Sequence, residues 1–533
     1  MKLYVISAKG KTEIESKEGA SLLEALAPSF GAQIHAPCGG RGTCQKCKID
    51  IIKNGEKFTV LACQTLAEEG MQILLSEEKE IFVEAKSQES KVKADEGLEG
   101  YGIACDIGTT TIVCRLLDLQ SGQCLAVLGE GNAQSTFGAD VISRIQAANE
   151  GHLEDLKKAV RGQLSRMILT LVKEAAERQK TTEMQERESL KRLEKDLLPE
   201  IKKMAIAANT TMCHLLTGLD PAGLGLAPFK PLSLFGKEVP AEELELPISG
   251  KVYICPAVSG YVGGDITADL LAISADQRTE PVLLIDVGTN GEIALGCGDH
   301  FLCCSTAAGP AFEGAQIKCG MTAAAGAISS VFWEAGQLQY KTIGETEAIG
   351  ICGSGLIDAV AVMLEIGAID ETGRMLDPED EDDQEEMSQE AEKYLFWTEE
   401  EELAFRLSEQ VYVTQADIRK LQLGKGAIAA GLQVLRKSYE KEGRKIKEVL
   451  LAGGFGSYIR PQSAARIGLI PAEFQQITRA IGNVALEGAQ AALVSASACE
   501  RLIKLQKNME YIELSGLEEF NDAYMESMLF PEE

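Results

Sequence analysis

The sequence of 533 residues is poor in histidine, in basic residues and in long apolar runs. It has 4 His, and 52 Lys and Arg stand against 81 Asp and Glu, a formal net charge of −29. This deficit of positive charge argues against nucleic acid or an anionic membrane as a partner. No window reaches the ~18 uncharged apolar residues of a spanning helix, and the first residues lack the apolar stretch of a secretory signal. We therefore expect a soluble, cytoplasmic protein.

The histidines are scattered along the chain, so no histidine metal site is predicted. The 15 cysteines are too few per residue for a disulfide scaffold, and their number is odd. In a reducing compartment a cysteine cluster is more often a metal site than a set of disulfides. The length is several times that of a ~150-residue domain, which predicts two or three cores.

The first 85 residues form a segment of their own, nearly neutral with ten basic and twelve acidic residues. Hydrophobic spacing predicts strands over 3–6 and 12–15, a helix over 21–26, and further strands over 48–52 and 72–75. This order suggests a β-grasp module. The polar residues 86–99 then read as a linker, because they lack aromatics and separate two unlike patterns.

Four cysteines of this segment, Cys38, Cys44, Cys47 and Cys63, have the spacing C-x5-C-x2-C-x15-C. A two-iron cluster needs four thiolates, three of them from one loop, and Gly39, Gly40 and Gly42 allow that loop to adopt positive φ. The spacing is similar to that of adrenodoxin-like ferredoxins. Zinc is the alternative, but zinc ribbons usually pair two C-x2-C steps and only one is present. We predict a [2Fe–2S] cluster, which carries one electron and has no substrate chemistry of its own.

After the linker, an internal repeat indicates a duplicated α/β lobe. The segment from Ile103 to Ile112 recurs from Leu284 to Ile293, and alignment of Asp106 with Asp286 gives an offset of 180 residues. Each copy is an apolar strand that runs into Asp-x-Gly-Thr and out into another strand. The carboxylate of such a hairpin can orient Mg²⁺, and its backbone N–H and hydroxyl groups can hold phosphate oxygens. The residues from 153 to 203 are predicted as one or two helices, followed by a short strand over 204–208.

A later strand ends in a glycine-rich turn, Gly453-Gly454-Phe455-Gly456. This ordered set resembles the acetate-kinase/sugar-kinase/Hsp70/actin superfamily of ATP-binding folds, a two-lobed RNase H-like α/β architecture. No Walker A motif occurs, which disfavours a P-loop. The resemblance implies ATP and Mg²⁺ as ligands, with Asp106 and Asp286 holding Mg²⁺. The residues that it implies for nucleotide binding are Gly108, Thr109, Thr110, Thr111, Gly288, Thr289, Asn290, Gly291, Gly353, Ser354, Gly355, Gly453, Gly454, Phe455 and Gly456. Glu292 and Glu313 are the candidates to orient the attacking water, and the sequence does not rank them.

A [2Fe–2S] module fused to such an ATPase resembles the reductive activators of corrinoid-dependent methyltransferase systems. The segments that carry this resemblance are 132–144, 209–214, 307–316 and 414–419. It implies ATP-dependent reduction of cobalt(II) corrinoid to cobalt(I), with the electron delivered through the cluster. The expected partners are a corrinoid protein and a low-potential electron donor, and a homodimer is possible. Typical members carry an extra domain between the ferredoxin and ATPase parts, whereas this chain has only the linker.

The predicted organisation is a ferredoxin-like domain, a linker, two ATPase lobes and a C-terminal return to the first lobe, over residues 1–84, 85–100, 101–265, 266–480 and 481–533. Residues 371–402 carry fifteen acids against two bases, and we interpret them as a solvated insertion, with docking of a basic partner as the alternative.

Several other functions stay open. These are an activator of a 2-hydroxyacyl-CoA dehydratase-type system, a non-redox chaperone or cluster-insertion factor, and a small-molecule kinase. A second cluster at Cys297, Cys303, Cys304 and Cys319 is conceivable, although small buried side chains are the favoured reading.

Overall fold

The computed structural model describes the chain except residues 8–9, 31–33, 35, 37–38, 41, 43–46, 54, 76–93, 179–197, 442, 455–457 and 533, and the side chains of 28, 29 and 178. The chain divides into two compact units. The first comprises Met1–Ala268 and Leu486–Ile503, and the second Asp269–Ala485 and Lys504–Glu533. Among the described helices, none combines the length and the apolar character needed to cross a bilayer.

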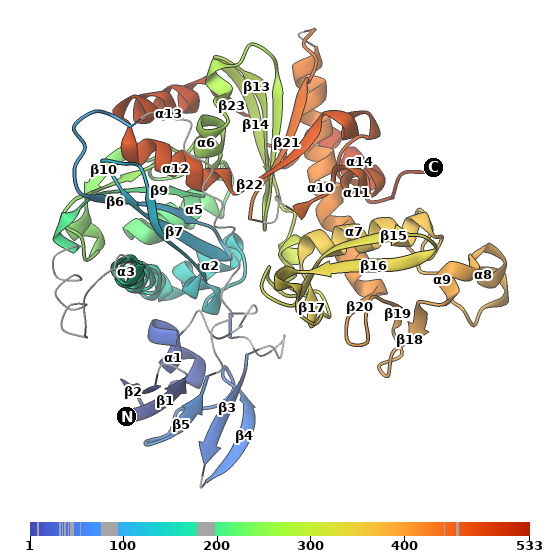
Figure 1. The fold of residues 1–533 in the computed structure, drawn as a ribbon, viewed down its shortest axis with the longest axis horizontal. Coiled ribbons are helices and arrows are strands. Elements are labelled where there is room, and N and C mark those ends of the chain that lie inside the picture. Colours follow the sequence, from blue (N-terminus) through green and yellow to red (C-terminus); the bar gives the residue numbers. More distant parts are fainter. Residues whose placement is uncertain are drawn as a thin grey trace. The chain divides into compact units, whose positions relative to one another are not determined.

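The N-terminal module is one mixed sheet with a helix against it (Figure 1). The sheet order is β2-β1-β5-β3-β4, and the elements are β1 (Lys2–Ser7), β2 (Gly10–Glu15), α1 (Leu22–Phe30), β3 (Lys48–Lys53), β4 (Glu56–Leu61) and β5 (Gln72–Leu74). Leu22 and Leu26 of α1 are fully buried against Leu3 and Val5 of β1. The pattern missed β4, although Asn54-Gly55 in the sequence is typical of a two-residue hairpin turn.

The first unit also contains the sheet that carries the first Asp-x-Gly-Thr hairpin. Its order is β10-β11-β9-β6-β7-β8. The strands are β6 (Tyr101–Ile107), β7 (Thr111–Asp118), β8 (Cys124–Gly131), β9 (Ile201–Ala208), β10 (Lys237–Pro240) and β11 (Lys251–Ile254). β9 begins at Ile201, so the prediction of helix up to residue 203 was wrong there. The cause is pairing: Ile201 lies opposite Tyr101 in a parallel ladder with β6, and this tertiary contact overrides local helix propensity.

Helices cover this sheet, and their starts are fixed by polar caps. Asp140 and Ser143 form a reciprocal capping box at the first of them, and Asn209 caps another. The helices against this sheet are α2 (Val141–Ala147), α3 (Leu153–Arg178), α5 (Thr210–Thr217), α6 (Gly264–Ala272), α12 (Val484–Val494) and α13 (Ala496–Asn508), and the last three extend beyond the bounds of the first unit. Leu156, Val160 and Leu164 of α3 are fully buried in the core of the sheet.

The sheet of the second unit repeats this topology over five of its six strands, which confirms the duplicated fold. Its sheet order is β22-β21-β12-β13-β14-β23. The strands are β12 (Val282–Val287), β13 (Gly291–Cys297), β14 (His300–Thr306), β21 (Glu448–Ala452), β22 (Thr478–Gly482) and β23 (Met509–Tyr511). In both units an antiparallel meander comes first, and two further strands then add in parallel beside its first strand. The two Asp-x-Gly-Thr hairpins therefore occupy equivalent positions.

Two small sheets and several helices complete the second unit. They are β15 (Ala327–Glu334), β16 (Gln337–Thr342), β17 (Gly350–Ile351), β18 (Leu395–Trp397), β19 (Leu403–Arg406), β20 (Tyr412–Thr414), α7 (Gly353–Glu365), α8 (Glu381–Glu386), α9 (Gln389–Glu392), α10 (Gln415–Glu440), α11 (Pro461–Arg466) and α14 (Glu518–Ser527). The acidic residues 371–402 form α8, α9 and β18. Within them the buried Asp383 accepts hydrogen bonds from Arg374 at 2.7 and 2.9 Å.

Candidate cluster and nucleotide sites

Two of the four predicted cluster ligands lie side by side. Cys47 comes just before β3 and Cys63 just after β4, and their Sγ atoms are 3.3 Å apart. The Ala62 N–H donates to the Cys47 carbonyl at 2.9 Å, which fixes the two segments to each other. Cys38 and Cys44 lie outside the described residues. The positive φ angles of Gly39, Gly40 and Gly42, +61°, +80° and +76°, are those that a loop folded around a cluster requires. Converging thiols beside such a loop fit a thiolate-bound cluster.

The two Asp-x-Gly-Thr hairpins are predicted to bind phosphate, and we call them the first and second phosphate hairpins. The first follows Asp106 at the end of β6. The Gly108 N–H donates to the Thr111 carbonyl at 2.9 Å, and a Cβ on Gly108 would lie 2.9 Å from the same oxygen, so the turn is too tight for a side chain there. Thr109 is buried, and Asn132 donates through Nδ2 to the Gly108 carbonyl at 2.8 Å. The hairpin therefore has a fixed backbone conformation before any ligand binds.

Three polar residues that hold this hairpin or lie beside it were not among the predicted site residues. The fully buried Arg144 donates to the Thr109 carbonyl at 2.6 Å and to the Gly138 carbonyl at 3.0 Å. Asn209 donates from Nδ2 to the Thr109 hydroxyl at 3.1 Å. Asp265, at the start of α6, comes two residues after Gly263. A Cβ on Gly263 would lie 2.4 Å from the Asn209 Cα, so the backbone before Asp265 lies against Asn209. Arg144 and Asn209 lie in segments that the sequence had already singled out, but spacing alone does not show which side chains turn inward.

Asp106 and Asp265 share a neighbourhood inside the first unit. Burial raises the pKa of the Cys255 thiol, and Cys499 and the Asp265 and Asp106 carboxylates add to that rise. Desolvation also raises the pKa of Asp265 to about 6, against the lowering effect of its backbone hydrogen bonds. A carboxylate with a pKa near neutral, beside a hairpin that is predicted to bind phosphate, is typical of a functional group.

The raised pKa of Asp265 predicts a pH dependence. Because Asp265 is protonated below pH 6, kcat/KM for ATP hydrolysis is expected to fall as the pH drops from about 7 to about 5, with a midpoint near 6. In Asp265→Asn the plateau rate should be lower and this midpoint absent. A profile with the same midpoint in the variant would contradict an ionised Asp265 as the cause.

The second phosphate hairpin is held by Glu313. The Thr289 hydroxyl donates to one Glu313 oxygen at 2.7 Å, and the Thr289 N–H donates to the other at 3.2 Å. The Gly288 N–H closes the turn on the Asn290 carbonyl at 2.9 Å. Glu292 lies directly opposite Asp286 in the β12–β13 ladder, so both side chains emerge on one face of the sheet. The two candidates to orient the attacking water thus have different surroundings. Glu313 holds the hairpin through Thr289, and Glu292 lies opposite Asp286.

The glycine-rich turn of residues 453–456, which is predicted to bind the adenosine part of ATP and is called the adenosine turn, meets the second phosphate hairpin within the second unit. Asp286 and Ala452 are register partners in the parallel β12–β21 ladder, and Gly453 follows with a φ of +102°. A Cβ on Gly453 would lie 2.5 Å from the Asp286 Oδ1 and 2.5 Å from the Val287 carbonyl. Gly454 has open space around its Cβ position, while Phe455 and Gly456 lie outside the described residues. Only glycine fits at position 453 without displacing Asp286.

Gly453→Ala is therefore expected to weaken ATP binding at least about tenfold, because the new methyl group must push the Asp286 carboxylate aside. The measurement is a nucleotide-binding titration. Gly443→Ala is the matched control, since Gly443 also has positive φ, +77°, but nothing within 4 Å of its Cβ position. Equal losses in both variants would mean that backbone strain, and not the contact with Asp286, is responsible.

The Gly353-Ser354-Gly355 turn opens α7 and has a clear packing role. A Cβ on Gly353 would lie 1.6 Å from the Phe312 carbonyl, and one on Gly355 would lie 2.2 Å from the Ile328 carbonyl. The buried Ser354 hydroxyl donates to the Ser329 carbonyl at 2.8 Å. Phe312 precedes Glu313, so this turn supports the segment that holds Thr289.

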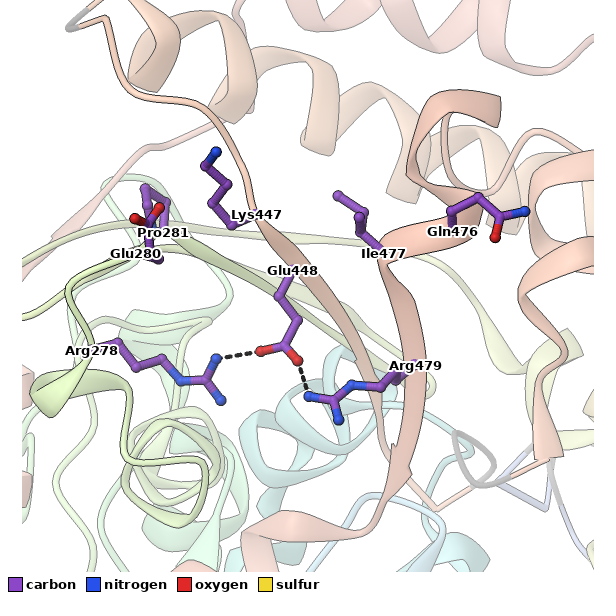
Figure 2. A pocket seen from close by; sticks show the side chains of 8 residues that line it. All are labelled: Arg278, Glu280, Pro281, Lys447, Glu448, Gln476, Ile477 and Arg479. Carbon is purple, nitrogen blue, oxygen red and sulfur yellow. Dashed lines mark hydrogen bonds and ion pairs between the residues drawn. The ribbon is translucent and has the colours of Figure 1, made fainter.

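A pocket of about 360 Å³ lies in the second unit, at the end of its six-stranded sheet where β12, β21 and β22 begin (Figure 2). Figure 2 shows the Glu448 carboxylate between the guanidinium groups of Arg278 and Arg479, with which it forms ion pairs. Since the three strands are parallel, Asp286 and Gly453 lie toward their opposite ends. The pocket is thus separate from the predicted phosphate-binding residues.

The four cysteines considered for a second cluster each contact a different backbone carbonyl. Cys303 and Cys304 are adjacent and fully buried in β14, where their side chains point to opposite faces. Their Sγ atoms contact the carbonyls of Glu510 and Gly431, and those of Cys297 and Cys319 contact Thr279 and Gln410. Across the part of the chain that is described, no group of three or more potential ligand side chains is placed to hold a metal ion.

Comparison with known families assigns most of the chain. Residues 280–533 match the C-terminal domain of RACo, the ASKHA domain, and residues 101–186 and 188–278 match the RACo middle region. Residues 6–68 match the 2Fe-2S iron-sulfur cluster binding domain. The two RACo matches together with the cluster domain cover the ferredoxin and ATPase parts expected from the sequence.

Individual relatives support the same assignment. The chain is 32% identical to the corrinoid activation enzyme RamQ of Eubacterium limosum, over 96% of each chain. It is 23% identical to the [Co(II) methylated amine-specific corrinoid protein] reductase of Methanosarcina barkeri, over 80% of this chain and 76% of the relative. A solved structure of a reductive activator for corrinoid, iron-sulfur protein superposes with a TM-score of 0.70 at 29% identity, over 99% of this chain and 98% of that one. The chain therefore belongs to the RACo family of corrinoid-activating proteins.

Proposed function

We propose that this protein reduces the cobalt(II) centre of a corrinoid protein to cobalt(I) in an ATP-dependent step, with the electron passing through a [2Fe–2S] cluster. The observation that carries the proposal is the presence of both parts in one chain. Cys47 and Cys63 place their Sγ atoms 3.3 Å apart in a 2Fe-2S domain, and a duplicated ASKHA fold with two phosphate hairpins follows. The printed names of the relatives, all activators or reductases of corrinoid proteins, support it.

The proposed roles follow from the residues. Cys38, Cys44, Cys47 and Cys63 hold the cluster, which when bound carries one electron at low potential. Asp106 and Asp286 hold Mg²⁺, and the backbone of the two hairpins binds the phosphates. The residues of the adenosine turn, 453–456, bind the base and ribose. Glu292, on the same face as Asp286, is proposed to orient the attacking water.

ATP is needed because cobalt(I) in a corrinoid is too reducing for an ordinary ferredoxin-type donor to populate it unaided. A nucleotide can shift this equilibrium only through a protein state that binds the two corrinoid oxidation states differently. We propose that ATP favours release or remodelling of a tight complex with the cobalt(II) protein. One electron enters from a low-potential donor and one leaves to cobalt, while ATP and water become ADP and phosphate.

The proposed partners are the corrinoid protein of a methyltransferase system, a low-potential electron donor and a second copy of the chain. The cytoplasm is the proposed location, because a reducing compartment suits the free cysteines, which include at least thirteen of the fifteen.

The experiment combines the purified, cluster-loaded protein with a cobalt(II) corrinoid protein, a low-potential reductant and MgATP. Cobalt(I) absorbance should appear only when all components are present. Cobalt(I) that forms equally without ATP would contradict the proposal. Absence of cobalt(I) with both a methylamine-specific corrinoid protein and a corrinoid iron–sulfur protein would also count against it.

A further inference from the structure

The segment of residues 221–236, within the connection between α5 and β10, exposes an unusual amount of apolar surface. We call it the leucine loop. Its side chains Leu226, Leu232 and Leu234 are 71%, 66% and 38% exposed. A single exposed leucine needs no explanation, but three within nine residues of one loop mark an interaction surface.

The leucine loop is held in one conformation by the rest of the first unit. The Leu232 N–H donates to His214 Nε2 at 3.1 Å, and the Tyr261 hydroxyl donates to the Leu224 carbonyl at 2.7 Å. The His214 ring also packs edge-on against Phe235, with ring centroids 5.3 Å apart. Because the loop is already ordered, a partner that binds it pays little conformational entropy.

His214 connects the leucine loop to the first phosphate hairpin through one short helix. His214 lies in α5, and its Nδ1–H donates to the Thr210 carbonyl at 2.8 Å, which leaves Nε2 as the acceptor for the loop. Asn209, which caps the same helix, donates to the Thr109 hydroxyl of the hairpin. Thr109, Asn209 and His214 therefore form a continuous set of contacts, through which nucleotide bound at the hairpin can act on the loop.

We propose that the leucine loop is a docking surface for the corrinoid protein in its cobalt(II) state, and that ATP changes this affinity through α5. The inference rests on the proposed function and adds to it the place of contact. Of the possible partners, the corrinoid protein is the one whose affinity must depend on ATP. The electron donor has to reach the cluster domain instead, and its binding needs no link to the nucleotide.

Size and charge also favour this occupant. The three partly exposed leucines offer on the order of 300 Å² of apolar surface, whereas a stable complex buries about 800 Å² on each partner. The loop therefore suits a partner that leaves after each electron transfer better than it suits a permanent second copy. Within residues 221–236 the sequence has one charged residue, Lys230, in a chain of net charge −29. The loop thus lacks the negative charge with which the rest of this chain repels an acidic protein surface.

The test uses the full, cluster-loaded chain with Leu226 and Leu232 both replaced by Ser. The probes are the cobalt(II) forms of a methylamine-specific corrinoid protein and of a corrinoid iron–sulfur protein, and the Kd of each is measured with and without a non-hydrolysable ATP analogue. For the probe that binds to wild type, we expect the Kd of the double variant to be at least about tenfold higher than that of wild type. Its ATP hydrolysis without probe and its cluster reduction by dithionite should stay within about twofold of wild type.

Leu169→Ser is the matched control, because Leu169 is 44% exposed on α3 of the same unit. Unchanged probe affinity in the double variant, or an equal loss in the control, would overturn the proposal. A changed oligomeric state would assign the loop to a second copy, and slower reduction by a protein donor would assign it to the donor. A wild-type Kd that differs less than twofold with the analogue would overturn the link through α5. Because Kd is measured apart from cobalt(I) formation, these results are distinct from failure of the proposed reaction.

Discussion

Replacing Asp106 with Asn is expected to lower ATP hydrolysis and ATP-dependent cobalt(I) formation by about 10²–10³-fold. The carboxylate stands at the end of β6, immediately before a hairpin that Arg144 and Asn209 hold rigid. A preorganised charge at the point where phosphate and metal charge must be balanced typically contributes an effect of this size. The same substitution at Asp286, at the equivalent position of the second hairpin, should give a loss of similar order.

The measurement pairs phosphate release with the visible spectrum of the cluster. Cluster absorbance should stay at the wild-type level, because Asp106 lies outside the 2Fe-2S domain. Asp118→Asn is the matched control, since Asp118 lies at the other end of the β6–β7 ladder, opposite Tyr101. If Asp106→Asn lost the cluster spectrum but hydrolysed ATP normally, the two functions would have been assigned to the wrong parts of the chain.

The parts of the fold that could be predicted are those with a local signature. The β-grasp module was predicted from strand and helix spacing, and the duplication from the repeat of Asp106 at Asp286. The structure confirms both and shows that each hairpin lies at the same place in equivalent sheets. Cys47 and Cys63 are sixteen residues apart in sequence, yet cluster chemistry alone was enough to expect their close approach.

The parts that could not be predicted depend on contacts between distant segments. Nothing in the sequence around Arg144 shows that its guanidinium reaches the Thr109 carbonyl, because that contact requires α2 to lie across the end of β6. The approach of Gly453 to Asp286 likewise depends on β21 pairing with β12, which lies some 160 residues earlier in the sequence. The helix predicted up to residue 203 ended too late for the same reason, since pairing with β6 decides where β9 begins.

Cys63→Ala should abolish cobalt(I) formation while leaving ATP hydrolysis without a corrinoid protein within about twofold of wild type. One thiolate of four is lost, and the remaining three do not complete the ligand set of a [2Fe–2S] centre. The ATPase residues lie in other parts of the chain, so their chemistry does not need the cluster. Iron analysis should give two irons per wild-type chain and close to none in the variant.

Cys297→Ala is the matched control for this loss. Cys297 is also half-buried, but it lies at the end of β13, where its thiol contacts the Thr279 carbonyl and the Tyr439 side chain. Its iron content and cobalt(I) yield should equal those of wild type. If Cys297→Ala also lost iron, or if wild type held clearly more than two irons, the cysteines of the second unit would bind a further cluster. The electron path would then include the ATPase part, and the separation of electron transfer from ATP chemistry would be wrong.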